Sequence, residues 1–117
     1  MTDYGFIADL RTEVTVPAGG ILSRTIHEDE RLSLVVFAFD AGQELSDHTS
    51  AKAAVIEILE GTASVVLDGE AREVGPGAWI AMPPGMRHAI RATTPLVMVL
   101  TLLTARETRD PVPAPRP

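Results

Sequence analysis

Residues Gly42–Gly61, GQELSDHTSAKAAVIEILEG, decide the fold. The stretch opens at a glycine turn, carries His48, and continues into the apolar run Ala53–Leu59 before the turn at Glu60-Gly61. An apolar run of this length between turn signals is typical of a buried β-strand. The stretch therefore predicts a core strand, preceded by a segment whose histidine lies at a pocket.

A second stretch, Gly77–His88 (GAWIAMPPGMRH), complements the first. It predicts a short strand, Ala78–Met82, followed by a turn at the Pro-Pro-Gly sequence, because proline fixes φ while glycine accepts conformations that other residues cannot. The strand after this turn, Arg87–Arg91, carries His88. We interpret the two stretches as the two halves of one ligand-binding β-barrel, in which the two histidines share a pocket.

The remainder of the chain predicts further short strands separated by turns. Asp68-Gly69 is a strong hairpin signal, because a type I′ turn needs positive φ at both positions. Short strands with turn signals roughly every 8–12 residues indicate a sandwich or barrel, so we expect an all-β fold with little or no helix. The other expected strands are Ile21–His27, Arg31–Asp40, Thr62–Leu67, Glu70–Val74 and Leu96–Leu103.

Composition and charge exclude several classes of function. The chain has 117 residues, a formal net charge of −6 and no cysteine. One domain is expected at this length, and without a basic cluster neither nucleic acid nor a membrane is an expected partner. The lack of cysteine excludes disulfides, thiolate zinc sites and cysteine nucleophiles. No signal-peptide core is seen and no apolar run reaches the ~18 residues of a membrane span, so we expect a cytoplasmic location.

Two spaced motifs carry a resemblance to a known family. The first motif consists of a glycine, five residues, His-x-His, three or four residues, a glutamate, six residues and a glycine. The second consists of a glycine, five residues, Pro-x-Gly, two residues, a histidine, three residues and an asparagine. At the first set of positions the chain has Gly42, His48, Ser50, Ala54 and Gly61, and at the second it has Gly77, Pro83, Gly85, His88 and Ala92.

On these motifs the chain resembles a single-domain cupin, an RmlC-like double-stranded β-helix or jelly-roll barrel. The resemblance implies a metal site for Fe, Mn, Ni or Zn made by three histidines and a glutamate. Of these ligands only His48 and His88 remain, since Ser50 and Ala54 replace the others. Stable catalytic sites usually use at least three protein ligands, so the expected cofactor is either none or one weakly bound divalent metal at a degenerate site.

Two further residues belong to this expectation. Alternation along a strand puts Glu44 on the same side as His48 if no bulge intervenes, which makes Glu44 a speculative third ligand. Met82 lies near His88 in the cupin fold, where its thioether is expected to form pocket wall rather than to bind a hard metal. The expected ligand pocket therefore consists of His48, Ser50, Ala54, Met82 and His88.

Three functions are compatible with this pocket, and no catalytic residue can be assigned. The favoured one is a binding module for a small organic molecule, since serine and alanine at ligand positions enlarge the cavity. The alternative is a divalent-metal-dependent oxygenase or isomerase that uses both histidines, with Glu44 as a candidate third ligand. A metal-free acid–base enzyme ranks last, because no acid that orients either histidine is evident in the sequence. Whether the protein is an enzyme stays open.

Three regions are expected along the chain. Residues 1–30 form N-terminal strands or an arm that packs on the barrel, residues 31–104 form the cupin barrel, and residues 105–117 form a proline-rich mobile tail. Both faces of Arg31–Asp40 are apolar, which predicts a second sheet over one face and a subunit partner over the other. A homodimer is therefore expected, as the resemblance also implies.

Three side chains outside the expected pocket are assigned structural or solvent-exposed roles. Trp79 is assigned to the core or to an interface, and Glu57 to an interface salt bridge, because it interrupts an apolar strand. His27 lies next to Glu28 and Asp29 near a hairpin tip, and we expect it to be solvated.

Overall fold

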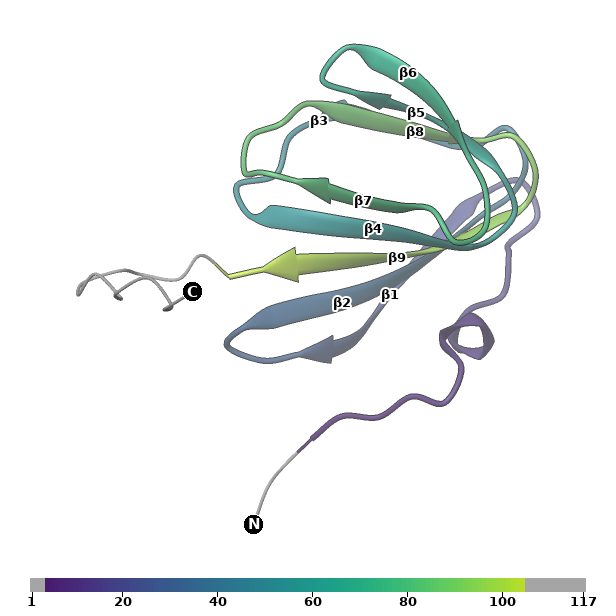
Figure 1. The fold of residues 1–117 in the computed structure, drawn as a ribbon. Coiled ribbons are helices and arrows are strands. Elements are labelled where there is room, and N and C mark those ends of the chain that lie inside the picture. Colours follow the sequence, from purple (N-terminus) through teal and green to yellow (C-terminus); the bar gives the residue numbers. More distant parts are fainter. Residues whose placement is uncertain (1–3, 105–117) are drawn as a thin grey trace.

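The computed structural model describes residues 4–104, except for the side chain of His48. Two antiparallel sheets face each other (Figure 1). One has the strand order β1-β2-β9-β4-β7 and the other has the order β3-β8-β5-β6. The strands are β1 (Ile21–Glu28), β2 (Leu32–Phe39), β3 (Glu44–His48), β4 (Ala53–Glu60), β5 (Ala63–Leu67), β6 (Glu70–Val74), β7 (Trp79–Met82), β8 (His88–Ala92) and β9 (Leu96–Leu103), and one short 3₁₀ turn, η1, spans Leu10–Glu13.

This arrangement confirms the all-β prediction of a cupin-type jelly roll. The hairpin between β5 and β6 turns at Asp68 and Gly69, whose φ angles are 51° and 87°. Positive φ at both positions is what the type I′ turn requires. Within residues 4–104, no helix is long and apolar enough to cross a membrane.

The main core lies between the two sheets. Along β4 the side chains alternate, so that Ala54, Ile56 and Ile58 are buried while Glu57 is exposed. These residues pack with Phe39 and Met98 of the neighbouring strands. Fully burying one such large apolar side chain stabilises the fold by about 1.5–3 kcal/mol. The period of two in β4 therefore fixes which of its residues can reach an internal pocket.

A smaller core lies on the outer face of the five-stranded sheet. Val36, Val97 and Val99 are buried there beneath the N-terminal segment, to which Leu10 and Val14 belong. The sequence predicts a subunit partner over this second face of β2. That explanation is wrong for the middle of the strand, because the chain's own N-terminal segment supplies the apolar cover. The proposed tail at 105–117 lies outside the described residues.

Candidate functional site

The two histidine positions of the motifs are paired across neighbouring strands. β3 and β8 are antiparallel, and the Cα partner of His48 is His88. Positions that are paired in this way belong to the same face of the sheet. Along β8 that face is the buried one, because His88, Ile90 and Ala92 are buried while Arg91 is exposed. The backbone of position 48 is therefore paired with a strand position whose side chain is buried.

His88 is a buried imidazole whose orientation is set by the backbone. Its side chain belongs to a residue that is only 7% exposed, and its Nδ1 lies 3.1 Å from the carbonyl oxygen of Met86. A carbonyl oxygen can only accept a hydrogen bond, so Nδ1 carries the proton. The neutral ring then has its lone pair on Nε2. This tautomer can accept a hydrogen bond, take up a proton or ligate a metal.

Ala54 and Met82 approach the same end of the barrel from the other sheet. They are Cα partners between β4 and β7, and each is 3% exposed. Met86, which holds His88 through its carbonyl group, also packs against the core. This end of the core thus contains a methyl group and two flexible thioethers, side chains that adapt to neighbours of different shape.

Ser50 ties together the two loops at this end of the barrel. The backbone N–H of Gly85 donates to the carbonyl oxygen of Ser50 at 2.8 Å, and the Ser50 hydroxyl accepts from the N–H of Lys52 at 3.1 Å. The first bond joins the β3–β4 loop to the β7–β8 loop, which lie at the same end of the molecule (Figure 1). Ser50 therefore helps to position the loops of the pocket, and its hydroxyl stabilises a turn.

The structure contradicts the proposed role of Glu44. A register shift lies between Leu45 and His48, so the strand gains one residue there relative to β8. Glu44 pairs with the exposed Arg91, whereas Leu45 pairs with the buried Ile90. The bulge moves Glu44 to the solvent face, and the alternation that made it a third ligand does not hold.

An ion pair lies directly beside the paired histidine positions. The guanidinium of Arg87 donates to Oδ2 of Asp47, with Nε at 3.0 Å. The hydrogen bond to Asp47 raises the pKa of Arg87. Both side chains are exposed. Because the two residues directly precede His48 and His88, the pair connects β3 to β8 at the pocket rim.

The donor set does not fit the metal centre that the family resemblance implies. Among the side chains that the structure describes, no three His, Cys, Asp or Glu residues gather. Glu44 lies on the solvent face and Ala54 has no donor, so His88 is the donor that the described side chains supply at these motif positions. Sites that hold a catalytic metal stably use at least three protein ligands.

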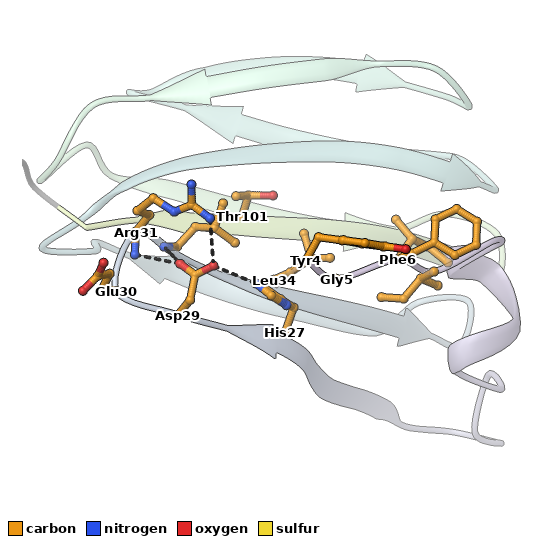
Figure 2. Close-up of a pocket in the computed structure, with 12 residues that line it drawn as sticks. Tyr4, Gly5, Phe6, His27, Asp29, Glu30, Arg31, Leu34 and Thr101 are labelled. Atoms are coloured by element: carbon orange, nitrogen blue, oxygen red, sulfur yellow. Dashed lines mark hydrogen bonds and ion pairs between the residues drawn. The ribbon is translucent and has the colours of Figure 1, made fainter. Parts of the chain in front are cut away.

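A second group of polar side chains was not predicted. A groove of about 920 Å³ lies on the outer face of the five-stranded sheet, beside the N-terminal segment (Figure 2). His27 lines it and makes a 2.8 Å contact with Asp29, so it is not the freely solvated residue that the sequence suggests. The missed signals were Tyr4, Gly5 and Phe6, two aromatic residues around a glycine in a segment without a clear pattern.

Comparison with known proteins gives consistent matches. A family model described as "Cupin domain" matches residues 35–103. A conserved protein of unknown function from Streptococcus pyogenes is 33% identical, with a TM-score of 0.79 over 91% of this chain and 93% of that one. An RmlC-like cupin from Shewanella frigidimarina is 27% identical, with a TM-score of 0.70 over 76% and 80% of the two chains. A cupin superfamily protein from Desulfitobacterium hafniense shares the fold at 21% identity, with a TM-score of 0.77 over 82% and 88%. A search of curated proteins gave no match.

Proposed function

Because this chain belongs to the cupin domain family, we propose that it binds a small organic molecule at the end of its barrel where positions 48 and 88 are paired. The observation that carries this proposal is the residue set there. His88 is buried in one sheet with His48 as its backbone partner on the next strand, while Ala54 and Met82 supply apolar surface from the other sheet. A few polar groups among apolar walls are typical of small-molecule sites.

The ligand that suits this set has an apolar body and one polar group. The body contacts Met82, Met86 and the space above Ala54. The polar group donates a hydrogen bond to Nε2 of His88, because the Met86 carbonyl group keeps the proton of the neutral ring on Nδ1. Asp47 and Arg87 do not enter the pocket and act by holding the two strands together.

The test begins with freshly purified protein and has two arms. Elemental analysis should find no stoichiometric metal, and a chelator should leave the melting temperature unchanged. A collection of small metabolites is then screened by thermal shift, and hits are titrated against His48→Ala, His88→Gln and His27→Ala. Binding should weaken in the first two variants and persist in His27→Ala, because His27 lies on the outer face of the sheet. One metal ion per chain at high occupancy, lost in the His48 variant, would refute the proposal.

One observation favours a second function, the metal-dependent oxygenase or isomerase. Metal-ligating histidines usually donate their other ring N–H to a carbonyl or carboxylate oxygen, and His88 does so toward Met86. This candidate now uses the two histidines without Glu44. Metal content that is unchanged by His48→Ala would end it.

The proposal extends to the oligomeric state of the protein and to its location in the cell. We propose a homodimer, supported by large apolar side chains on the surface, among them Trp79 and Leu103. We also propose a cytoplasmic location, as the sequence leads us to expect.

A further inference from the structure

The groove on the outer face of the five-stranded sheet is separate from the histidine pair inside the barrel. Its walls include Tyr4, Phe6 and Leu10 of the N-terminal segment and Leu34 of β2. Its polar end consists of His27, Asp29, Glu30, Arg31 and Thr101 (Figure 2). The volume of about 920 Å³ is in the range of sites that hold small organic ligands.

A β-bulge directs His27 into this groove. In β1, Ser23 pairs with Phe37 and Thr25 pairs with Val35, in the row of β2 that faces the main core. Strict alternation would put His27 in the same row. The register shift between Thr25 and His27 instead pairs His27 with Leu34, which lies on the outer face. Bulges that re-aim a side chain are frequent next to functional sites.

Asp29 fixes which nitrogen of His27 carries the proton. Its Oδ1 accepts from the backbone N–H groups of Arg31 at 2.7 Å and Leu32 at 3.1 Å. Its Oδ2 contacts Nε2 of His27 at 2.8 Å and Nη2 of Arg31 at 3.4 Å. A carboxylate with four donors around it is ionised and can only accept. His27 therefore donates from Nε2, and the lone pair of the neutral ring is on Nδ1.

The backbone of Gly5 lies close to this ring. A Cβ atom at position 5 would lie 2.9 Å from Nδ1 of His27 and 3.1 Å from Cε1, so any other residue would crowd the ring. Within residues 4–104 no hydrogen-bond donor to Nδ1 is described. Tyr4 and Phe6 flank the glycine and are 85% and 80% exposed, although both line the groove. An acceptor nitrogen thus lies beside two uncovered aromatic rings.

We propose that this groove binds a small alcohol or phenol with an apolar body. The ligand hydroxyl donates to Nδ1 of His27, and the body lies against Phe6 and Leu34. A carboxylate ligand is disfavoured, because the lone pair and the charges of Asp29 and Glu30 repel it, and the guanidinium of Arg31 is already directed at Asp29. The proposal does not depend on the barrel pocket and can fail or succeed without it.

The test compares three probes of similar shape: 4-ethylphenol, ethylbenzene and 4-ethylbenzoate. Each is titrated into the full chain carrying ¹⁵N-labelled histidine, and the ring nitrogen signals are followed by NMR. We expect 4-ethylphenol to shift the Nδ1 signal of His27 saturably, without shifting His88. Ethylbenzene and 4-ethylbenzoate should bind roughly tenfold more weakly or not at all, since each lacks the donated hydrogen bond.

Matched variants test whether the binding of 4-ethylphenol depends on the glycine beside His27. Gly5→Ala should weaken the binding of 4-ethylphenol roughly tenfold, because the new methyl group would lie 2.9 Å from Nδ1 of His27 and force the ring to move. Gly20→Ala is the control, since its Cβ would meet nothing closer than 3.8 Å. If Gly5→Ala lowers the melting temperature strongly, Phe6→Ala replaces it, with the same expected loss.

Three results would overturn the proposal. The first is equal affinity for 4-ethylphenol and ethylbenzene, or 4-ethylphenol affinity that is unchanged in both Gly5→Ala and Phe6→Ala. The second is a shift confined to His88, which would assign the probe to the barrel pocket. The third is a dimer in light scattering that Phe6→Ala dissociates, because a second copy would then occupy the groove.

Discussion

At the residue scale, two histidines are held in opposite tautomers by oxygen acceptors. His88 donates from Nδ1 to the carbonyl oxygen of Met86 inside the barrel, while His27 donates from Nε2 to the carboxylate of Asp29 on the outer face. The ring nitrogen left with a lone pair is therefore Nε2 in one and Nδ1 in the other. The oxygen partner of His27 is a side chain, so a single substitution at Asp29 tests this contact.

Asp29→Asn should destabilise the protein in a way that depends on pH. The hydrogen bond from His27, followed by that from the backbone of Arg31, holds the pKa of Asp29 well below its usual value of 3.8. A carboxyl group whose pKa is lowered by folding adds stability that is complete above the unfolded value and is lost as pH falls through the folded one. The melting temperature of the wild-type protein should therefore be higher than that of Asp29→Asn at about pH 7. The difference between the two melting temperatures should shrink below about pH 4.

Thermal denaturation from about pH 7 down to about pH 2.5 checks this expectation. Glu30→Gln is the charge-matched control, since the described part of the chain contains no hydrogen bond to that carboxylate. A gap in melting temperature that stays constant to the lowest pH would contradict the assigned role of Asp29.

Restoring the lost motif residues should create a metal site in the barrel. The double variant Ser50→His and Ala54→Glu adds two donors near the paired positions 48 and 88, so four ligands become available. Because Ala54 is buried, the added glutamate should lower the melting temperature of the metal-free variant. Added Mn²⁺ or Ni²⁺ should raise it again, with an affinity at least about tenfold above wild type, or ~1.4 kcal/mol.

Isothermal titration and melting curves with each metal measure both effects. Glu73→Gln in the same background is the control, because Glu73 is exposed on the edge strand β6. Equal metal affinity in the double variant and the wild type would mean that these positions do not converge as the motif implies.

At the element scale, turns and strands follow from local sequence, while bulges do not. The Asp68-Gly69 hairpin and the strand at Ala53–Leu59 were predictable, because turn chemistry and apolar runs are local properties. The side of β3 on which Glu44 lies was not predictable, since a bulge depends on how two distant strands pair. For the same reason the sequence predicted neither the outward turn of His27 nor the groove beside it. Strict alternation holds on β4, where it correctly puts Ala54 inside and Glu57 outside.

The turn after β4 gives a prediction at this scale. Gly61 has a φ of 83°, and a Cβ there would clash with the carbonyl oxygen of Pro95. Gly61→Ala should therefore destabilise through both backbone strain, about 1–2 kcal/mol, and the clash, and we expect about 2–4 kcal/mol in total. Gly77→Ala isolates the strain alone, because Gly77 has a φ of 92° with nothing within 4 Å of the added atom. Urea denaturation should show a lower midpoint for Gly61→Ala than for Gly77→Ala, with an unchanged slope. Equal urea midpoints would mean that the loop carrying Pro95 moves away from the added methyl group without a loss of stability.

At the scale of the whole molecule, one sheet separates two candidate binding sites. The inner face of the five-stranded sheet carries Ala54 and Met82 of the proposed barrel site, and the outer face carries the groove along β1 and β2. The strand order puts β7 at the opposite edge of the sheet from β1. A partner subunit that docks along β7 would therefore leave the groove open, and the two sites and the interface can coexist.

The single tryptophan makes the proposed dimer directly measurable. Trp79 is 63% exposed on the edge strand β7, where its register partner is the exposed Glu57. Unpaired edges that carry large apolar side chains favour association, and tryptophan is enriched at interfaces. We expect a dimeric mass in light scattering at micromolar concentration, and a blue shift of tryptophan emission as the protein concentration rises through the dissociation constant.

Trp79→Gln should shift the equilibrium toward monomer, whereas Leu22→Gln, on the far edge strand β1, should not. A monomeric mass with concentration-independent emission would exclude the dimer, and a dimer insensitive to Trp79→Gln would place the interface elsewhere on the surface.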